Sequence, residues 1–249
     1  MKTEWDYTDL AKAYLKRATY SPDAIDQLFK LANIDKDAKA CDVGAGVAHL
    51  TKELLQRGLE VVAVEPNDEM RKYGKIETKD QSKVTWYEGT GEETGQEAGA
   101  FDLVTFGSSF NVTDRLTTLT ETKRILKNNG WFACMWNHRD LSDPFQEKIE
   151  SVIKKHIRNY EYGSRREDQT EVIEKSQLFK QVHYIEGNVL HLQSKSDLIE
   201  AWKSHATLER QAGDSFTLII EEIERLVKAY PDTMIKVPYT TRVWCAQLK

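Results

Sequence analysis

The sequence predicts an α/β domain built on a doubly wound sheet. Short, continuously apolar runs alternate with stretches whose apolar residues recur at helical spacing over residues 35–140. Turn-forming residues such as glycine and asparagine separate the two kinds of segment. Continuously apolar strands are typical of a parallel sheet that helices cover on both faces. A chain of 249 residues suffices for one such domain with helical additions.

Each element of this region has a local signal. Ser21-Pro22-Asp23 supplies an N-cap, a first-turn proline and an acid near the positive helix end, which predicts a helix at 22–33. Glycines at 58 and 74 end the next two helices, and Asn129-Gly130 closes a fourth. The helices are expected at 22–33, 50–57, 67–74 and 116–126, and the strands at 40–43, 61–64, 84–87, 101–106 and 131–136.

The regular alternation of predicted strands and helices ends after residue 140. Asp143-Pro144 caps a helix to about residue 158, and the polar stretch 161–170 reads as a loop. Strands at 182–185 and 239–248 flank helices at 195–206 and 215–229. The expected fold is Rossmann-like, mostly parallel with an antiparallel last strand. We expect one domain over 1–249, with a helical lead (1–34), a core (35–140), and lid helices with the final strands (141–249).

The composition of the chain argues against several classes of binding partner. The net charge of −5 argues against a nucleic acid, which usually needs a basic face. No apolar run approaches 18 residues and the first residues lack a signal-peptide core, so neither a membrane nor export is expected. Cys41, Cys134 and Cys245 lie far apart in apolar segments and form no metal-ligand pair. The simplest interpretation is a reduced, cytoplasmic protein without a metal, acting as a monomer or homodimer.

The sharpest motif is Asp42-Val43-Gly44-Ala45-Gly46, which ends the first strand and opens a helix. Glycines let the backbone approach a ligand there, and Glu65 at the end of the next strand can accept ribose hydroxyls. Dinucleotide dehydrogenases and S-adenosylmethionine (SAM) methyltransferases both use this geometry, and a purely structural glycine turn is a third interpretation. Position 49 is His49 instead of a third glycine, and Asp42 is unwelcome beside a pyrophosphate, so SAM is favoured.

Five ordered segments resemble class I SAM-dependent methyltransferases of the small-molecule type. They are the glycine turn at 42–46, the ribose segment at 64–70, the adenine segment at 88–95, the fourth strand at 101–105, and the helix-turn-strand signature at 124–131. Trp136-Asn137-His138-Arg139-Asp140 and the Ser204-His205 region further resemble the trans-aconitate-methyltransferase-like branch. Two departures are Val47-Ala48 in the turn and Asn111, where that branch commonly carries a histidine.

The resemblance implies SAM as cofactor and S-adenosylhomocysteine (SAH) as product. Asp42, Gly44, Ala45 and Gly46 would hold the methionine end and Glu65 the ribose. The remaining implied cofactor contacts are Pro66, Met70, Gly91, Glu92 and Gly107. Tyr14 and Arg17 resemble a pair in the lead that folds over the cofactor, although such aromatic spacing is equally typical of a core.

Substrate contacts are expected just beyond the strand ends, where α/β sheets bind ligands. Ser108 and Asn111 follow the fourth strand, and Asn137, His138 and Arg139 follow the fifth. His138 is the candidate general base, against the alternative of a surface histidine in a polar loop. Tyr20 in the lead and His205 on a lid helix complete the candidate substrate site.

Three functions remain open at this point. The first is methyl transfer to an oxygen, nitrogen or carbon atom of a small molecule. The chain lacks the (Asp/Asn/Ser)-Pro-Pro-aromatic motif of nucleic-acid amino methyltransferases and the paired glutamates of protein arginine methyltransferases. The second is a protein that binds SAM without methylating. The third and most distant is an NAD-linked oxidoreductase.

Overall fold

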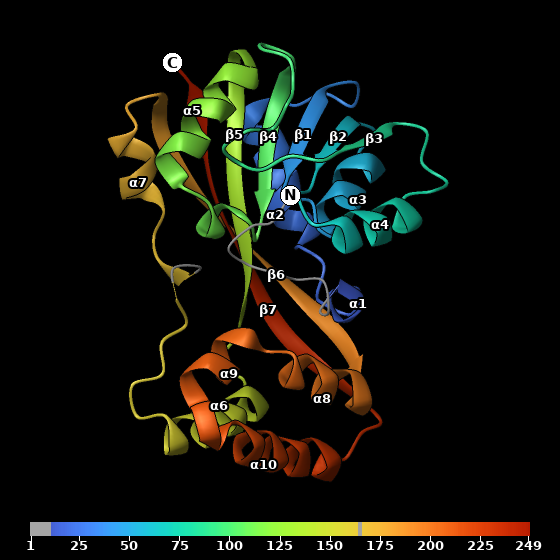
Figure 1. The fold of residues 1–249 in the computed structure, drawn as a ribbon, viewed down its shortest axis with the longest axis vertical. Coiled ribbons are helices and arrows are strands. Elements are labelled where there is room, and N and C mark those ends of the chain that lie inside the picture. The colour runs from blue at the N-terminus through green and yellow to red at the C-terminus, as the bar shows by residue number, and fades with distance from the viewer. Residues whose placement is uncertain (1–10, 164–165) are drawn as a thin grey trace.

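A computed structural model describes residues 11–163 and 166–249, which form a seven-stranded sheet with the order β3-β2-β1-β4-β5-β7-β6 (Figure 1). Strands β1 to β5 are parallel, and β7 pairs antiparallel with both β5 and β6. The predicted Rossmann-like sheet with an antiparallel last strand is therefore confirmed. The strands are β1 (Lys39–Val43), β2 (Glu60–Val64), β3 (Val84–Tyr87), β4 (Phe101–Gly107), β5 (Leu126–Arg139), β6 (Phe179–Ser194) and β7 (Met234–Leu248).

The helices begin where the sequence supplies caps. The hydroxyl of Ser21 accepts from the backbone N–H of Ala24, and the side chains of Asn67 and Asp143 cap two further helices in the same way. The α-helices are α1 (Ala11–Tyr14), α2 (Pro22–Ala32), α3 (His49–Gln56), α4 (Asp68–Glu77), α5 (Arg115–Ile125), α6 (Pro144–His156), α7 (Thr170–Lys175), α8 (Lys195–Lys203), α9 (Ala206–Ala212) and α10 (Phe216–Ala229).

The sheet is buried on both faces because apolar side chains of β5 alternate between them. Phe132, Cys134 and Trp136 join a cluster with α5 and α7. Ala133 and Met135 join a second cluster with α2 and α3 on the opposite face. All three cysteines lie buried on strands, as the sequence predicts, where they pack as small apolar side chains.

A helical cap stands on an extension of the sheet. Met135 of β5 pairs with Gly107, the last residue of β4, whereas β5 continues to Arg139 and pairs there with Tyr239 of β7. Strands β6 and β7 run beyond the parallel strands together with β5, toward α6, α8, α9 and α10 (Figure 1). These helices share a separate apolar core with Ile235 and Val237 of β7. The cap therefore lies beyond the carboxyl ends of the parallel strands.

Several predicted boundaries are wrong: α4 continues past Gly74 to Glu77, and the fifth strand begins at Leu126 instead of at residue 131. The fifth strand ends at 139 instead of 136, because β7 starts at 234 and supplies hydrogen-bonding partners for the extra residues. The helix expected at 195–206 is two helices, α8 and α9, and α7 is a helix that the sequence did not reveal. The division into lead, core and lid stays a prediction, and residues 1–10 of the lead lie outside the described residues. Among the described helices, none is long and apolar enough to cross a bilayer.

Candidate cofactor and acceptor site

The glycine turn after β1 is held in a conformation that requires glycine. Gly44 and Gly46 have φ of +68° and +56°, and Ala48 follows with φ +75°. A Cβ on Gly44 would lie 2.4 Å from the Cβ of Ser109, whereas a Cβ on Gly46 would meet no atom within 4 Å. The N–H groups of Gly44 and Ala45 both donate to the carbonyl of Val64, at 2.8 and 3.1 Å. The turn is therefore fixed to the end of β2 and leaves open space beside Gly46.

Asp42 supports this turn from below. Its side chain is 0% exposed, and its two oxygens accept from the hydroxyls of Thr51 at 2.6 Å and Thr105 at 3.0 Å. Burial raises the pKa of Asp42 to about 6, against the two hydroxyl hydrogen bonds, which lower it. The carboxylate is therefore enclosed between β1, β4 and α3, and its expected contact with the cofactor's ammonium stays a prediction. Neither threonine was recognisable from sequence as its partner.

Glu65 lies at the end of β2 and reaches back to the glycine turn. One carboxylate oxygen accepts from the N–H of Gly46 and the other from the N–H of Asn67, both at 2.9 Å. Burial raises the pKa of Glu65, and the two backbone hydrogen bonds partly offset that effect. The predicted acid and the predicted glycine are thus in direct contact.

Apolar residues and the lead close the other side of the turn. Met70 packs with Val47 and Ala11, and Tyr14 packs against this cluster. His49 Nε2 lies 2.7 Å from the carbonyl oxygen of Tyr14, and the guanidinium of Arg17 lies 3.4 Å from the Tyr14 ring centroid. The structure therefore brings Tyr14, Arg17 and Met70 to the turn, and their contact with the cofactor stays a prediction. Pro66 is half-buried just before the Asn67 cap of α4.

The residues expected near adenine lie in the loop after β3. Gly91 is buried, and a Cβ there would meet Thr113 at 2.8 Å. Glu92 accepts from the backbone N–H of Asp114 at 2.7 Å, so its carboxylate points toward the start of α5. The loop is therefore closely packed on the segment that follows β4.

The end of β4 forms a tight corner beneath the lead. A Cβ on Gly107 would lie 2.8 Å from the hydroxyl of Tyr20, which is itself 3.0 Å from the hydroxyl of Ser108. Ser108 has φ +60°, and its N–H donates to the carbonyl of Met135 at 2.8 Å. The neighbouring Ser109 donates to the carbonyl of Val43 at 2.6 Å. This corner joins β1, β4, β5 and the lead.

The polar residues of β5 divide between the two faces of the sheet. Asn111 accepts from the indole N–H of Trp136 at 2.9 Å, and His138 is two residues further on that face and 4% exposed. Asn137 faces the other way and donates to the carbonyls of Ala18 and Thr19 in the lead, at 3.1 and 2.8 Å. The expected loop position of Asn137, His138 and Arg139 is wrong, because all three pair with β7.

The end of β5 meets the cap through an aromatic stack. The Arg139 guanidinium lies 4.1 Å from the ring centroid of Trp202, and the ring of His205 stacks on Trp202 at 5.3 Å with an interplanar angle of 15°. His205 also accepts from the N–H of Leu208 and so caps α9. Trp202 had no sequence signal, since a tryptophan in an amphipathic helix is ordinarily core.

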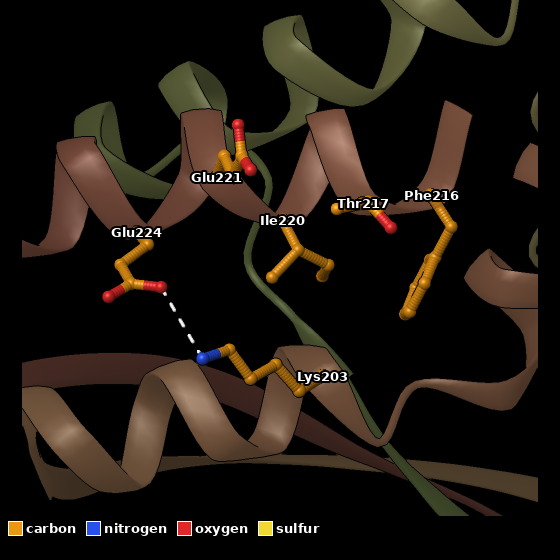
Figure 2. Close-up of a pocket in the computed structure, with 6 residues that line it drawn as sticks. All are labelled: Lys203, Phe216, Thr217, Ile220, Glu221 and Glu224. Carbon is orange, nitrogen blue, oxygen red and sulfur yellow. Dashed lines mark ion pairs between the residues drawn. The ribbon is translucent and has the colours of Figure 1, made fainter. Parts of the chain in front are cut away.

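Two pockets in the cap lie away from all of these residues. One, of about 380 Å³, lies between α8 and α10, and Lys203 pairs with Glu224 across it at 3.4 Å (Figure 2). The other, of about 360 Å³, lies between α6 and α10. Neither is lined by a residue of the glycine turn or of the strand ends. The candidate site is therefore defined by Glu65, the glycine turn and the polar strand ends, and not by the two pockets of the cap.

Residues 41–134 match the family model described as a methyltransferase domain. This part of the chain is similar to methyltransferase domains. A methyltransferase of uncharacterized function from Mycobacterium tuberculosis is 32% identical over 137 residues, covering 55% of this chain and 54% of that relative. A demethylmenaquinone methyltransferase from Staphylococcus saprophyticus is 32% identical over 133 residues, covering 51% of this chain and 57% of that protein. The matched part therefore spans little more than half the length of these relatives.

Solved structures share the methyltransferase fold along most of the chain. The YcgJ protein of Bacillus subtilis has a TM-score of 0.55 at 15% identity, covering 91% of this chain and 98% of that one. Phosphoethanolamine N-methyltransferase 2 of Haemonchus contortus, solved with SAH, has a TM-score of 0.57 at 16% identity, covering 97% of this chain and 58% of that one. At such identities the likeness concerns the fold alone.

Proposed function

We propose that this chain transfers a methyl group from SAM to an oxygen, nitrogen or carbon atom of a small-molecule acceptor. The observation that carries the proposal is the contact between Glu65 and the N–H of Gly46, which joins an acid at one strand end to a glycine turn at the neighbouring strand end. The match of residues 41–134 to a methyltransferase domain supports it.

The residues around the turn fit SAM. Space is open beside Gly46, a carboxylate lies at its N–H, and the thioether of Met70 lies on the apolar side. Gly44, Ala45 and Gly46 would hold the methionine end and Glu65 the ribose. Pro66 would lie in the ribose segment beside Glu65, and Met70, Gly91 and Glu92 would border adenine. Gly107 would pass beneath the cofactor, and Tyr14 and Arg17 would cover it. Asp42 would act as the support of the turn.

The cofactor supplies an activated methyl group, so the chain's own residues have little covalent chemistry to perform. Their task is to hold the acceptor in line with the methyl group and to keep water away. Ser108 and Tyr20 lie at the end of β4, and Asn111 is held by Trp136 on the neighbouring strand. His138 is the candidate to take up a proton from an acceptor that carries one, and positioning suffices for an acceptor that does not.

A small acceptor is supported by the cap and by one relative. The cap lies beyond the carboxyl ends of the parallel strands (Figure 1), which favours a metabolite over a polymer as acceptor. One relative is named for demethylmenaquinone, a small molecule. A protein that binds SAM without methylating would share the same turn, and only a transfer assay separates the two.

Titration calorimetry with SAM, SAH and NADH tests the proposal. Wild-type protein should bind SAM and SAH, Glu65→Ala should bind both at least about tenfold more weakly, and Glu60→Ala at the other end of β2 should bind like wild type. Binding of NADH without either adenosyl compound would overturn the proposal. A screen with labelled methyl groups then separates transfer from binding, and its product identifies the acceptor atom.

A further inference from the structure

Arg139 is a partly buried arginine that has no carboxylate partner within the described residues. Its Nε donates to the hydroxyl of Tyr239 at 3.1 Å, and its guanidinium stacks on Trp202 at 4.1 Å. Stacking occupies the face of a guanidinium and leaves its in-plane N–H groups free to donate. By contrast, an ion pair holds each of five other arginines, namely Arg57, Arg71, Arg115, Arg124 and Arg242.

A second arginine, Arg166, lies beside Arg139 and likewise has no ion-pair partner among the described residues. Arg166 donates to the backbone carbonyl of Arg139 at 3.4 Å and stacks on Tyr162 at 4.1 Å. Burial lowers its pKa, the charges of Tyr162 and Glu150 raise it, and the positive charges of Arg242 and Arg139 lower it again. Glu150 already accepts from the Tyr162 hydroxyl and pairs with Lys154 at 3.2 Å. Positive charge is thus left incompletely balanced here.

Buried polar atoms without partners lie in the same region. The indole N–H of Trp202 has no hydrogen-bond partner among the described residues, although Trp202 is 5% exposed. Gln146 is 1% exposed and lies one turn before Glu150 on α6, and in the described part of the chain both of its side-chain amide atoms also lack partners. A buried donor without a partner destabilises the fold, so an unsatisfied donor in a native structure needs an explanation, and a bound ligand is one.

The position of Arg139 along β5 sets its distance from the cofactor end of the site. Met135 pairs with Gly107 at the end of β4, and Arg139 is four residues further along the same strand. Four residues of extended strand span about 13 Å. A group held by Arg139 is therefore separated by most of that length from the atom that meets the methyl group.

We propose that Arg139, assisted by Arg166 and the indole N–H of Trp202, binds an oxyanion, carboxylate or phosphate, at the far end of an elongated acceptor. This proposal rests on the proposed function, and it further specifies that the methyl acceptor is anionic and elongated. The planar guanidinium suits two-point binding of either oxyanion. The oxyanion would serve to bind the acceptor and would not receive the methyl group, because Arg139 lies four residues along β5 from the position opposite Gly107.

Fluorine NMR of three probes tests this assignment, namely 4-fluorobenzoate, 4-fluorophenyl phosphate and the neutral isostere 4-fluorobenzamide. Each is titrated into the full chain with and without SAH, whose own binding is measured by calorimetry. The variants are Arg139→Gln, Arg139→Lys and, as a matched control, Arg225→Gln on α10. Arg225 is an exposed arginine whose Nε donates to the backbone of its own helix, so its substitution removes the same charge away from the site.

At least one charged probe should bind wild type and Arg225→Gln alike, and Arg139→Gln at least about tenfold more weakly. Arg139→Lys keeps the positive charge but loses the planar guanidinium, so its affinity for the charged probe should lie between those of wild type and Arg139→Gln. It replaces Arg139→Gln in the test if that variant does not fold. The stronger of the two charged probes distinguishes carboxylate from phosphate. Equal binding of the benzamide, no loss in either Arg139 variant, or displacement of the anion by SAH overturns the assignment. Absence of SAH binding would overturn the proposed function instead. The titration with the charged probes would still show whether Arg139 binds an anion.

Discussion

The backbone N–H of Gly46 donates to the carboxylate of Glu65 across 2.9 Å. The two residues follow neighbouring strands, β1 and β2, and are 19 positions apart in the chain. Because Glu65 also accepts from Asn67, one side chain fixes both the glycine turn and the cap of α4. The acid is therefore held at the turn by the chain's own backbone, which reduces the ordering that binding requires.

Glu65→Gln should separate the charge of this side chain from its shape. The amide keeps one acceptor oxygen but turns an NH₂ group toward one of the two backbone N–H donors, so one hydrogen bond is lost. We expect SAH binding to weaken at least about tenfold in calorimetry, because hydrogen bonds to charged groups contribute about 1.5–3 kcal/mol. An affinity equal to wild type would show that the charge of Glu65 is not used.

Asp42→Asn should change how stability depends on pH. The folded pKa of about 6 lies above the unfolded value, so the folded chain binds the proton more tightly. The free energy of unfolding therefore falls as pH rises from about 4 to about 6, and the loss persists above that range. Asparagine can accept from one threonine and donate to the other, so urea unfolding at pH 7 should show a gain of up to about 3 kcal/mol.

Asp102→Asn is the control for that experiment. Partial burial raises the pKa of Asp102, but hydrogen bonds from Lys127 and the N–H of Lys39 outweigh this and lower it. Its contribution to stability is therefore present above the unfolded pKa and is lost as pH falls through the folded value. The two variants should alter the pH profile in opposite directions, and a common direction would contradict the assignment for Asp42.

Gly44→Ala should disable the turn through a specific contact. The added Cβ would lie 2.4 Å from the Cβ of Ser109, and φ +68° disfavours any side chain. Gly99→Ala shares the conformational strain, at φ +63°, but its Cβ meets nothing within 4 Å. We expect SAH binding to be lost in Gly44→Ala, retained in Gly99→Ala, and partly restored in Gly44→Ala/Ser109→Gly. Failure of the double variant to recover any binding would contradict the assignment of the loss to the contact with Ser109.

Tyr20 and Ser108 should respond unequally to removal of their hydroxyls. Tyr20 is 6% exposed, whereas Ser108 is exposed and can exchange its partner for water. Tyr20→Phe should therefore lower the free energy of unfolding by less than about 1 kcal/mol, and Ser108→Ala by about 1–3 kcal/mol. In a Tyr20→Phe background Ser108→Ala should have little effect, and additive losses in urea unfolding would contradict the coupling.

The parts of the fold that local signals encode were predictable, and the parts that depend on distant pairing were not. The caps Ser21, Asn67 and Asp143 and the buried strands β1 to β4 carry their own signals. The final residues of β5 are polar, and only β7, about one hundred residues later, makes them a strand. Likewise the motif located Glu65 and Gly46, whereas the partners of Asp42 come from α3 and β4 and required the structure.

The continuity of β5 into the cap has a consequence for selectivity. A flexible linker would let the cap adjust to acceptors of many sizes, but a strand paired with β7 over its whole extension resists stretching. If Arg139 binds the far end of the acceptor as proposed, the rigid strand fixes the separation between Gly107 and Arg139, and the site would select acceptors by length. Inserting residues into both β5 and β7 would then change the length of the acceptor that is preferred.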